Sequence, residues 1–252
     1  MMAVLALFGV VVAAALYARE KIRNGALQKS VAYYRSELAR LEQALHRFTA
    51  APLVEDVIAR GAPSGGQRRT VTVMFADLQG FTSLSTQLEA EVMVRVLNGY
   101  FQAMSAAIGQ HEGYVSKFMG DGLMAFFGGI EHNPWQARDG VLAALAMRRA
   151  LVAYNADLAT QNLPQLKFGI GLHAGEVVIG ALGSDRLMEY TVIGDVVNVA
   201  ARVESLTRKH QTDILITKEI QQHLDERFVL RACEPEIVKG KSEPIATWAV
   251  EE

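Results

Sequence analysis

The sequence predicts an α+β fold with a βαββαβ core and a C-terminal extension, preceded by a transmembrane helix and a helical linker. Three observations support this prediction. Strand-like and helix-like runs follow one another in that order from Arg69 onward, half of the residues are hydrophobic, and an uncharged apolar run opens the chain. The formal net charge of −2 gives no indication of a nucleic-acid-binding surface, so no nucleic-acid partner is expected.

The apolar run, residues 2–18, is about long enough to cross a thin membrane as a helix. Arg19, Lys21 and Arg23 follow it, and by the positive-inside rule they place the rest of the chain in the cytoplasm. We therefore expect residues 1–18 to be a single-pass anchor in the plasma membrane or the cell inner membrane. A cleaved signal peptide is one alternative, although no basic segment precedes the apolar run. A truncated or internal helix is the other.

Residues 19–68 are expected to form a cytoplasmic linker that contains a coiled coil. Apolar residues in this stretch step alternately by four and three positions through three heptads, at Leu27, Val31, Tyr34, Leu38, Leu41, Leu45 and Phe48. A single amphipathic helix that packs on its own domain is the alternative. The stretch 61–69, GAPSGGQRR, indicates a flexible boundary, so residues 69–252 are taken as the globular domain.

The core is expected to contain a strand, a helix, a hairpin, a helix and a strand, at residues 70–76, 89–110, 114–127, 134–160 and 167–174. Gly120-Asp121-Gly122 supplies the hairpin turn, and Pro134 suits the start of the long helix. Beyond the core we expect strands near 176–181 and 187–193, a helix from 195 to about 210, and then short strands with one helix.

Two carboxylates are predicted to meet at one edge of this sheet. In a βαββαβ sheet the first two strands run parallel and the third returns antiparallel between them, so the end of the first strand and the hairpin turn lie at the same edge. This places Asp77 beside Asp121. Because neighbouring carboxylates repel each other, the pair favours a divalent cation such as Mg²⁺. Taken alone, Asp121 also fits an ordinary turn residue, since Gly-Asp-Gly is good turn chemistry.

Two further segments carry groups suited to sugars and phosphates. DLQGFTSLS, residues 77–85, offers backbone N–H groups and a helix N-terminus, although Ser and Thr before a helix usually indicate capping. In GDVVNVAARVES, residues 194–205, Asp195 is the expected N-cap, and Asn198 and Arg202 share one helix face. An amide and a guanidinium one turn apart can hold a sugar and a phosphoryl group, and a solvated polar face is the alternative.

Together these segments resemble the catalytic domain of class III nucleotidyl cyclases, in the subclass of adenylyl cyclases with Thr at a base-reading position. The matching residues are 71–85, 113–128, 167–205 and 237–241. The resemblance implies a ferredoxin-like α+β core and an obligate head-to-tail homodimer with active sites at the subunit interface. It also implies conversion of ATP to cyclic AMP and pyrophosphate with two divalent metal ions, Mg²⁺ or Mn²⁺. A guanylyl cyclase and a catalytically silent, membrane-tethered nucleotide-binding module are the alternatives.

The same resemblance implies roles for individual residues. It assigns metal binding to Asp77, Leu78 and Asp121, and catalysis to Asn198 and Arg202. It assigns substrate binding to Lys117, Thr191, Phe81, Thr82, Arg186 and Lys239. Lys117 is a donor suited to N1 of adenine, whereas guanine presents an N–H group there. Guanylyl cyclases resemble this pattern but carry Glu and Cys at the positions of Lys117 and Thr191.

Overall fold

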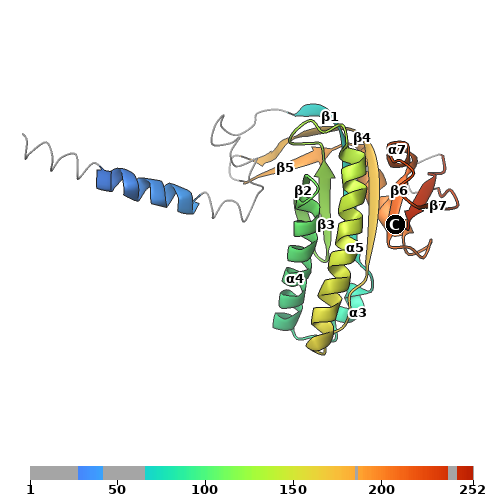
Figure 1. Ribbon diagram of the computed structural model, residues 1–252, viewed down its shortest axis with the longest axis horizontal. Helices are drawn as coiled ribbons and strands as arrows, with labels where there is room; N and C mark the ends of the chain where they lie inside the picture. The colour runs from blue at the N-terminus through green and yellow to red at the C-terminus, as the bar shows by residue number, and fades with distance from the viewer. Residues whose placement is uncertain (1–27, 42–65, 185–186, 238–242, 252) are drawn as a thin grey trace, which may run out of the picture. The chain divides into compact units, whose positions relative to one another are not determined.

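The computed structural model describes residues 28–41, 66–184, 187–237 and 243–251. The chain divides into two compact units, Met1–Glu55 and Asp56–Glu252. In the first unit, residues 28–41 form a helix, as the heptad pattern predicts (Figure 1). Its seam residues are all exposed in the single chain: Val31, Tyr34, Leu38 and Leu41. The coiled coil therefore stays a prediction.

The predicted membrane anchor, residues 2–18, lies outside the described residues. Among the residues that the structure does describe, no helix combines the length and the apolar character needed to span a membrane.

The second unit contains an eight-stranded mixed sheet and five described helices. The strands are β1 (Gln67–Leu78), β2 (Gly113–Met119), β3 (Gly122–Phe127), β4 (Phe168–Ser184), β5 (Leu187–Ile193), β6 (Ile214–Thr217), β7 (Leu230–Ala232) and β8 (Thr247–Val250). The helices are α3 (Phe81–Ser85), α4 (Ala90–Gly109), α5 (Gln136–Thr160), α6 (Asp195–Leu206) and α7 (Lys218–Gln221). The strand order is β2-β3-β1-β4-β6-β8-β7, and β5 pairs with β4.

The first four strands have the predicted βαββαβ topology. β1 pairs antiparallel with β3 on one side and with β4 on the other, and β2 pairs antiparallel with β3. β4 differs from the prediction, because the two strands expected at 167–174 and 176–181 form one strand that continues through Gly175. The reason is continuous pairing: β1 pairs with residues 168–179 of β4, and β5 pairs with residues 178–184.

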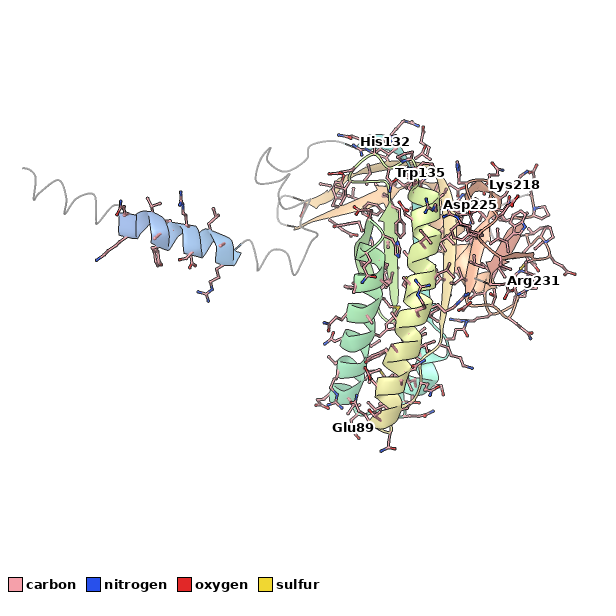
Figure 2. All side chains as sticks on the ribbon, viewed as in Figure 1. Glu89, His132, Trp135, Lys218, Asp225 and Arg231 are labelled. Atoms are coloured by element: carbon pink, nitrogen blue, oxygen red, sulfur yellow. The ribbon has the colours of Figure 1, made fainter. Side chains whose placement is uncertain are left out.

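Helices α4 and α5 pack side by side on one face of the sheet (Figure 1). They run antiparallel, since Glu89 at the start of α4 and Trp135 at the start of α5 lie at opposite ends of the pair (Figure 2). The main hydrophobic core lies between these helices and the sheet. Its sheet side includes Met74, Leu78, Phe127, Ile170 and Leu172.

Helix α6 lies on the other face of the sheet. Successive residues of a strand face opposite sides, and in β6 Ile214 belongs to the main core while Leu215 packs in a second cluster with Val199 and Val203 of α6. The sheet is therefore covered on both faces, with α6 opposite the long helices.

Glycines of β4 bring α6 unusually close to the strand. Ile170 points into the main core, while Gly169 and Gly171 face α6. A Cβ atom at Gly171 would lie 2.1 Å from the backbone nitrogen of Glu204, and one at Gly169 would lie 2.3 Å from Thr207 Oγ1. The backbone of the helix therefore rests directly on the backbone of the strand.

Replacing Gly171 with alanine is expected to destabilise the fold by about 3 kcal/mol, because the new Cβ atom would overlap the backbone of Glu204 and force α6 away from β4. Gly109→Ala is the matched control, since a Cβ atom there meets nothing within 4 Å and alanine is the better helix former. Urea unfolding of both variants gives the measurement. If Gly171→Ala were as stable as the wild type, the close packing of α6 would be wrong.

Candidate active site

Asp77 and Asp121 come together at the edge of the sheet, as the strand order predicts. Ala76 pairs with Leu123 in the β1–β3 ladder, so Asp77 lies opposite the start of β3, next to the hairpin turn. Its Oδ1 atom would be 2.9 Å from a Cβ atom placed on Gly122. Burial raises the pKa of Asp77 above its ordinary value, and the negative charge of Asp121 raises it further. The two carboxylates are therefore close enough to repel each other.

Two more side chains, the carboxyl of Glu204 and the guanidinium of Arg208, lie with Asp77 and Asp121. We call these four residues the acidic group. Arg208 donates a hydrogen bond from Nη2 to Asp77 Oδ2 at 3.1 Å. Glu204 is buried in α6, and its Oε1 atom has no hydrogen-bond partner among the described residues. Burial, and then the charge of Asp77, raise the pKa of the Glu204 carboxyl to about 7. Neither Glu204 nor Arg208 was predicted, because their sequence spacing gives no sign of this contact.

The donor set of the acidic group suits a hard divalent cation, because carboxylate oxygens are the ligands that Mg²⁺ and Mn²⁺ prefer. Within the described ranges, no cluster of three or more His, Cys, Asp or Glu side chains is arranged to hold a metal by itself. Asp77 and Asp121 could therefore hold a cation only if water or a bound substrate supplied further oxygens. The Leu78 side chain is buried in the core, so only its carbonyl oxygen could take part.

A second set of polar residues lies between β2 and β5 and consists of Ser116, Lys117, Glu189 and Thr191. We call it the base group, because the resemblance assigns Lys117 and Thr191 to the nucleotide base. Lys117 Nζ is 2.6 Å from Glu189 Oε1. Ser116 Oγ is 3.3 Å from Thr191 Oγ1 and 3.3 Å from the carbonyl oxygen of Tyr190. The structure thus brings Lys117 and Thr191 to one place, beside two residues that the sequence did not single out.

A β-bulge at Ser116 sets the direction of Lys117. The register of the β2–β3 ladder shifts between Val115 and Lys117, which leaves Ser116 as the extra residue. Val115 packs against the main core, and the Phe118 ring lies 4.4 Å from the ring of Phe101 in α4. Strict alternation would have put Lys117 on the same face as Val115, and the extra residue turns it toward β5 instead.

Helix α6 presents Asn198 and Arg202 one turn apart, as predicted. Asn198 is exposed, and Arg202 is half-buried with an Nη1 atom that has no hydrogen-bond partner among the described residues. The helix begins at Asp195 with Gly194 in the cap position, so the expected N-cap was one residue too late. Asp195 lies instead in the first turn, where the helix dipole favours its negative charge. The buried face of α6 carries three valines, Val196, Val199 and Val203.

Comparison with known proteins identifies the family. Residues 65–252 match the family model described as the adenylate and guanylate cyclase catalytic domain. The chain belongs to this family. An adenylate cyclase of Anabaena cylindrica is 33% identical over 226 residues, which is 85% of this chain and 44% of that protein. The chain therefore spans less than half the length of that relative.

Solved cyclase structures are similar to this cyclase domain as well. The guanylyl cyclase Cya2 has 35% sequence identity and a TM-score of 0.68, over 74% of this chain and 94% of that chain. The adenylyl cyclase CyaB from P. aeruginosa has 32% identity and a TM-score of 0.70, over 75% of this chain and 97% of that chain. Both kinds of cyclase match about equally well, so overall similarity does not decide between the two nucleotides.

The resemblance also assigns substrate binding to Phe81, Thr82, Arg186 and Lys239, and the structure describes only the first two. The loop after Asp77 contains the short helix α3, which Gly80 caps in the left-handed region at φ 74°. Phe81 is half-buried and packs against the main core, whereas Thr82 is exposed. Their roles in substrate binding stay predictions. Arg186 and Lys239 lie outside the described residues.

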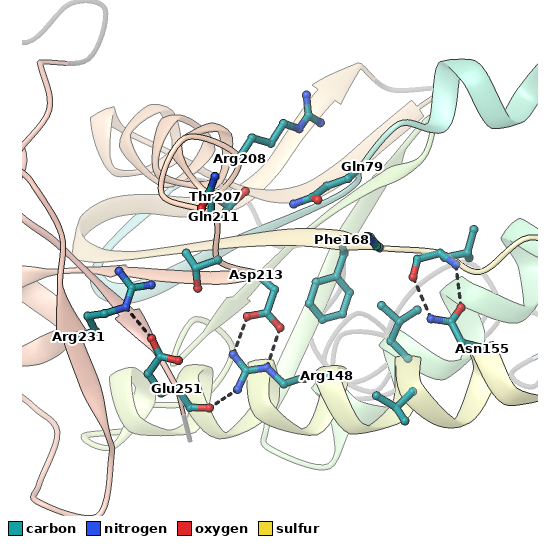
Figure 3. A pocket seen from close by; sticks show the side chains of 15 residues that line it. Gln79, Arg148, Asn155, Phe168, Thr207, Arg208, Gln211, Asp213, Arg231 and Glu251 are labelled. Atoms are coloured by element: carbon teal, nitrogen blue, oxygen red, sulfur yellow. Dashed lines mark hydrogen bonds and ion pairs between the residues drawn. The ribbon is translucent and has the colours of Figure 1, made fainter.

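A cleft of about 590 Å³ borders the acidic group at Arg208 (Figure 3). Four of its other charged groups are paired with one another: Arg148 binds both carboxylate oxygens of Asp213 at 2.7 and 2.6 Å, and Arg231 binds Glu251 at 2.8 Å. Because these groups hold α5, β7 and the end of the cyclase domain together, we do not place the substrate there.

Glu204→Gln is expected to stabilise the metal-free protein at pH 8 and to change its stability little at pH 4.5. The carboxyl has a pKa of about 7 in the fold, against an ordinary value of 4.5. Between pH 4.5 and about pH 7 the folded protein keeps a proton on Glu204 that the unfolded chain releases. The free energy of unfolding that this group contributes therefore falls as the pH rises. The gain at pH 8 should be about 1–3 kcal/mol.

Urea unfolding in the presence of a chelator, at both pH values, gives the measurement. Glu226→Gln, at an exposed position, is the control and should show no pH-dependent difference. An equal effect of Glu204→Gln at pH 4.5 and pH 8 would contradict the raised pKa.

Proposed function

We propose that this chain is an adenylyl cyclase that converts ATP to 3′,5′-cyclic AMP and pyrophosphate. Membership of the cyclase family supports the reaction type. The choice of ATP rests on Lys117, which lies in one group with the Thr191 hydroxyl. A lysine ammonium can only donate hydrogen bonds, so it pairs with N1 of adenine, whereas N1 of guanine carries a proton of its own. With guanine in the site, the Lys117 ammonium and the N1–H group would both be donors, and neither could accept a hydrogen bond from the other.

The reaction forms one phosphorus–oxygen bond and breaks another. The ribose 3′-oxygen attacks the α-phosphorus, and the bond from that phosphorus to the oxygen shared with the β-phosphate breaks. Pyrophosphate leaves with the electron pair, and the proton of the 3′-hydroxyl passes to water. Divalent cations held by Asp77 and Asp121 would supply electrostatic stabilisation of the charge on the phosphates and the 3′-oxygen.

Asn198 and Arg202 would position the ribose and offset charge on the α-phosphate. They lie one turn apart on α6, and the Arg202 Nη1 atom is buried without a partner among the described residues, so a phosphate oxygen brought against it would supply the hydrogen bond that it lacks. Removing a donor that stabilises charge developing in a reaction typically lowers turnover by about 10²–10³-fold.

Each active site would lie between two copies of the chain. In the part of the chain that the structure describes, no hydrogen bond or ion pair joins the base group to the acidic group. Exposed apolar side chains also flank the base group, at Leu182 and Ile193. A second copy could cover them, and it would bring its acidic group to the base group of the first. One copy would then supply Asp77 and Asp121, and the other Lys117, Thr191, Asn198 and Arg202.

The purified 252-residue chain with Mn²⁺ or Mg²⁺ is expected to form cyclic AMP from ATP about 10- to 100-fold more efficiently than cyclic GMP from GTP. Asp77→Asn should lower turnover at least about 100-fold while the dimer persists in sedimentation experiments. Product from GTP alone would refute the adenylyl assignment in favour of a guanylyl cyclase. Nucleotide binding without any product would favour a silent binding module.

We further propose that residues 1–18 anchor the chain in a membrane and that residues 19–68 pair two copies as a coiled coil. The apolar run, the basic residues after it and the heptad pattern support this arrangement. The full chain should sediment with membranes. A variant without residues 1–60 should stay in the supernatant and lose activity more steeply on dilution, because a tether raises the local concentration of the partner. Equal activity of both proteins at every dilution would refute the role of the coil.

A further inference from the structure

We propose that Arg208 is an internal counter-ion, which holds the Asp77 carboxylate in the metal-free protein and must leave it when a divalent cation binds. The proposal rests on the proposed function only in that it takes Asp77 and Asp121 as the residues that hold the cation. It gives Arg208 a positioning role. The wild type should then bind a free cation more weakly than a variant without this side chain.

The two oxygens of the Asp77 carboxylate face different neighbours. Oδ1 lies toward the hairpin, since it would be 2.9 Å from a Cβ atom placed on Gly122. Oδ2 accepts a hydrogen bond of 3.1 Å from Arg208 Nη2. A cation bound by this carboxylate would therefore lie beside the guanidinium. Positive charges that are so close repel each other, so the cation and Arg208 compete for Asp77.

The contact between Arg208 and Asp77 is weak enough to be exchanged. Arg208 forms a single hydrogen bond with the described residues, and its side chain is 55% exposed. In the same cleft, Arg148 instead binds both oxygens of Asp213 and also donates to two backbone carbonyls. A bidentate pair of that kind is a strong contact, whereas a single exposed contact contributes little to folding. Arg208 can thus leave Asp77 while the fold persists.

The surroundings of Arg208 also leave room for this movement. Arg208 belongs to the turn after α6, which ends at Leu206, and it borders the cleft of about 590 Å³ (Figure 3). Gln79 lines the same cleft, and its amide oxygen could accept a hydrogen bond from the displaced guanidinium. The side chain can therefore move while α6 stays packed on β4.

The charges of the acidic group explain why the metal-free protein needs a counter-ion. Burial raises the pKa of Asp77, the charge of Asp121 raises it further, and Arg208 lowers it in part. Without Arg208, the repulsion between these carboxylates would be greater. A divalent cation carries more positive charge than the guanidinium and would take over this role. Arg208 therefore stabilises the metal-free form more than the metal-bound form.

The first test measures Mn²⁺ binding to the purified 252-residue chain without nucleotide, from the electron paramagnetic resonance signal of free Mn²⁺. Arg208→Gln is expected to bind Mn²⁺ about 5- to 50-fold more tightly than the wild type, because the competing charge is gone. Arg208→Lys keeps the charge, so its dissociation constant should stay within about threefold of the wild-type value.

Lys209→Gln is the matched control. It makes the same change of charge at the next residue, whose ammonium pairs with Glu236 at 2.5 Å and not with the acidic group. Its dissociation constant for Mn²⁺ should stay within about twofold of the wild-type value, since salt screens distant surface charges. The proposal is overturned if Arg208→Gln binds Mn²⁺ no more tightly than Lys209→Gln, or if neither Arg208→Gln nor the wild type binds it.

The second test compares thermal unfolding with a chelator and with saturating Mn²⁺. With the chelator, Arg208→Gln should unfold about 2–8 °C below the wild type, because its carboxylates lack the counter-ion. With Mn²⁺ the difference should disappear, since the variant gains more from the metal than the wild type does. A merely structural contact would lower the midpoint equally in both conditions, and that result would overturn the proposal.

The same proteins separate this proposal from the proposed function. If the wild type formed no cyclic product but Arg208→Gln still bound Mn²⁺ more tightly, the proposed function would fail and the role of Arg208 would stand. If the wild type formed cyclic AMP and Arg208→Gln left the affinity for Mn²⁺ unchanged, the role of Arg208 would fail alone.

Discussion

The close contact between α6 and β4 fixes the helix that carries Asn198 and Arg202 on the sheet that carries Asp77. Where Gly171 lies under Glu204, no side chain separates the helix from the strand, so α6 cannot slide or tilt without a clash. The strand beside β4 is β1, which ends in Asp77. The same helix carries Asn198 and Arg202 closer to its start. One packing contact therefore sets where Asn198 and Arg202 lie on the sheet of their own copy.

The acidic group is unfavourable for the protein on its own. Burial and mutual repulsion raise the pKa values of Asp77 and Glu204, and the guanidinium of Arg208 offsets only part of the negative charge. Perturbed acids of this kind are more typical of functional sites than of structural ion pairs. A divalent cation would add the positive charge that the group lacks, so the arrangement that costs stability is the one that favours metal binding.

Strand order was sufficient to predict that Asp77 and Asp121 meet, because the sheet topology allows only one edge for both. The direction of Lys117 could not be predicted in the same way. It depends on the bulge at Ser116, and a bulge is a property of the register between two strands that neither strand shows alone. The length of β4 was missed for a related reason, since Gly175 looks like a break until its partner in β1 is known.

Glu189 and Glu204 were overlooked because an acidic residue in a sequence usually indicates solvated surface. In the structure they act in opposite ways. Glu189 cancels the charge of Lys117, so the base group is close to neutral, whereas Glu204 places a third carboxyl, with a pKa raised to about 7, beside Asp77. A nucleoside triphosphate has the same division, with a neutral base at one end and phosphates that carry cations at the other. Under the proposed function, the base group of one copy would suit the neutral base, and the acidic group of the other copy would suit the metal-bound phosphates.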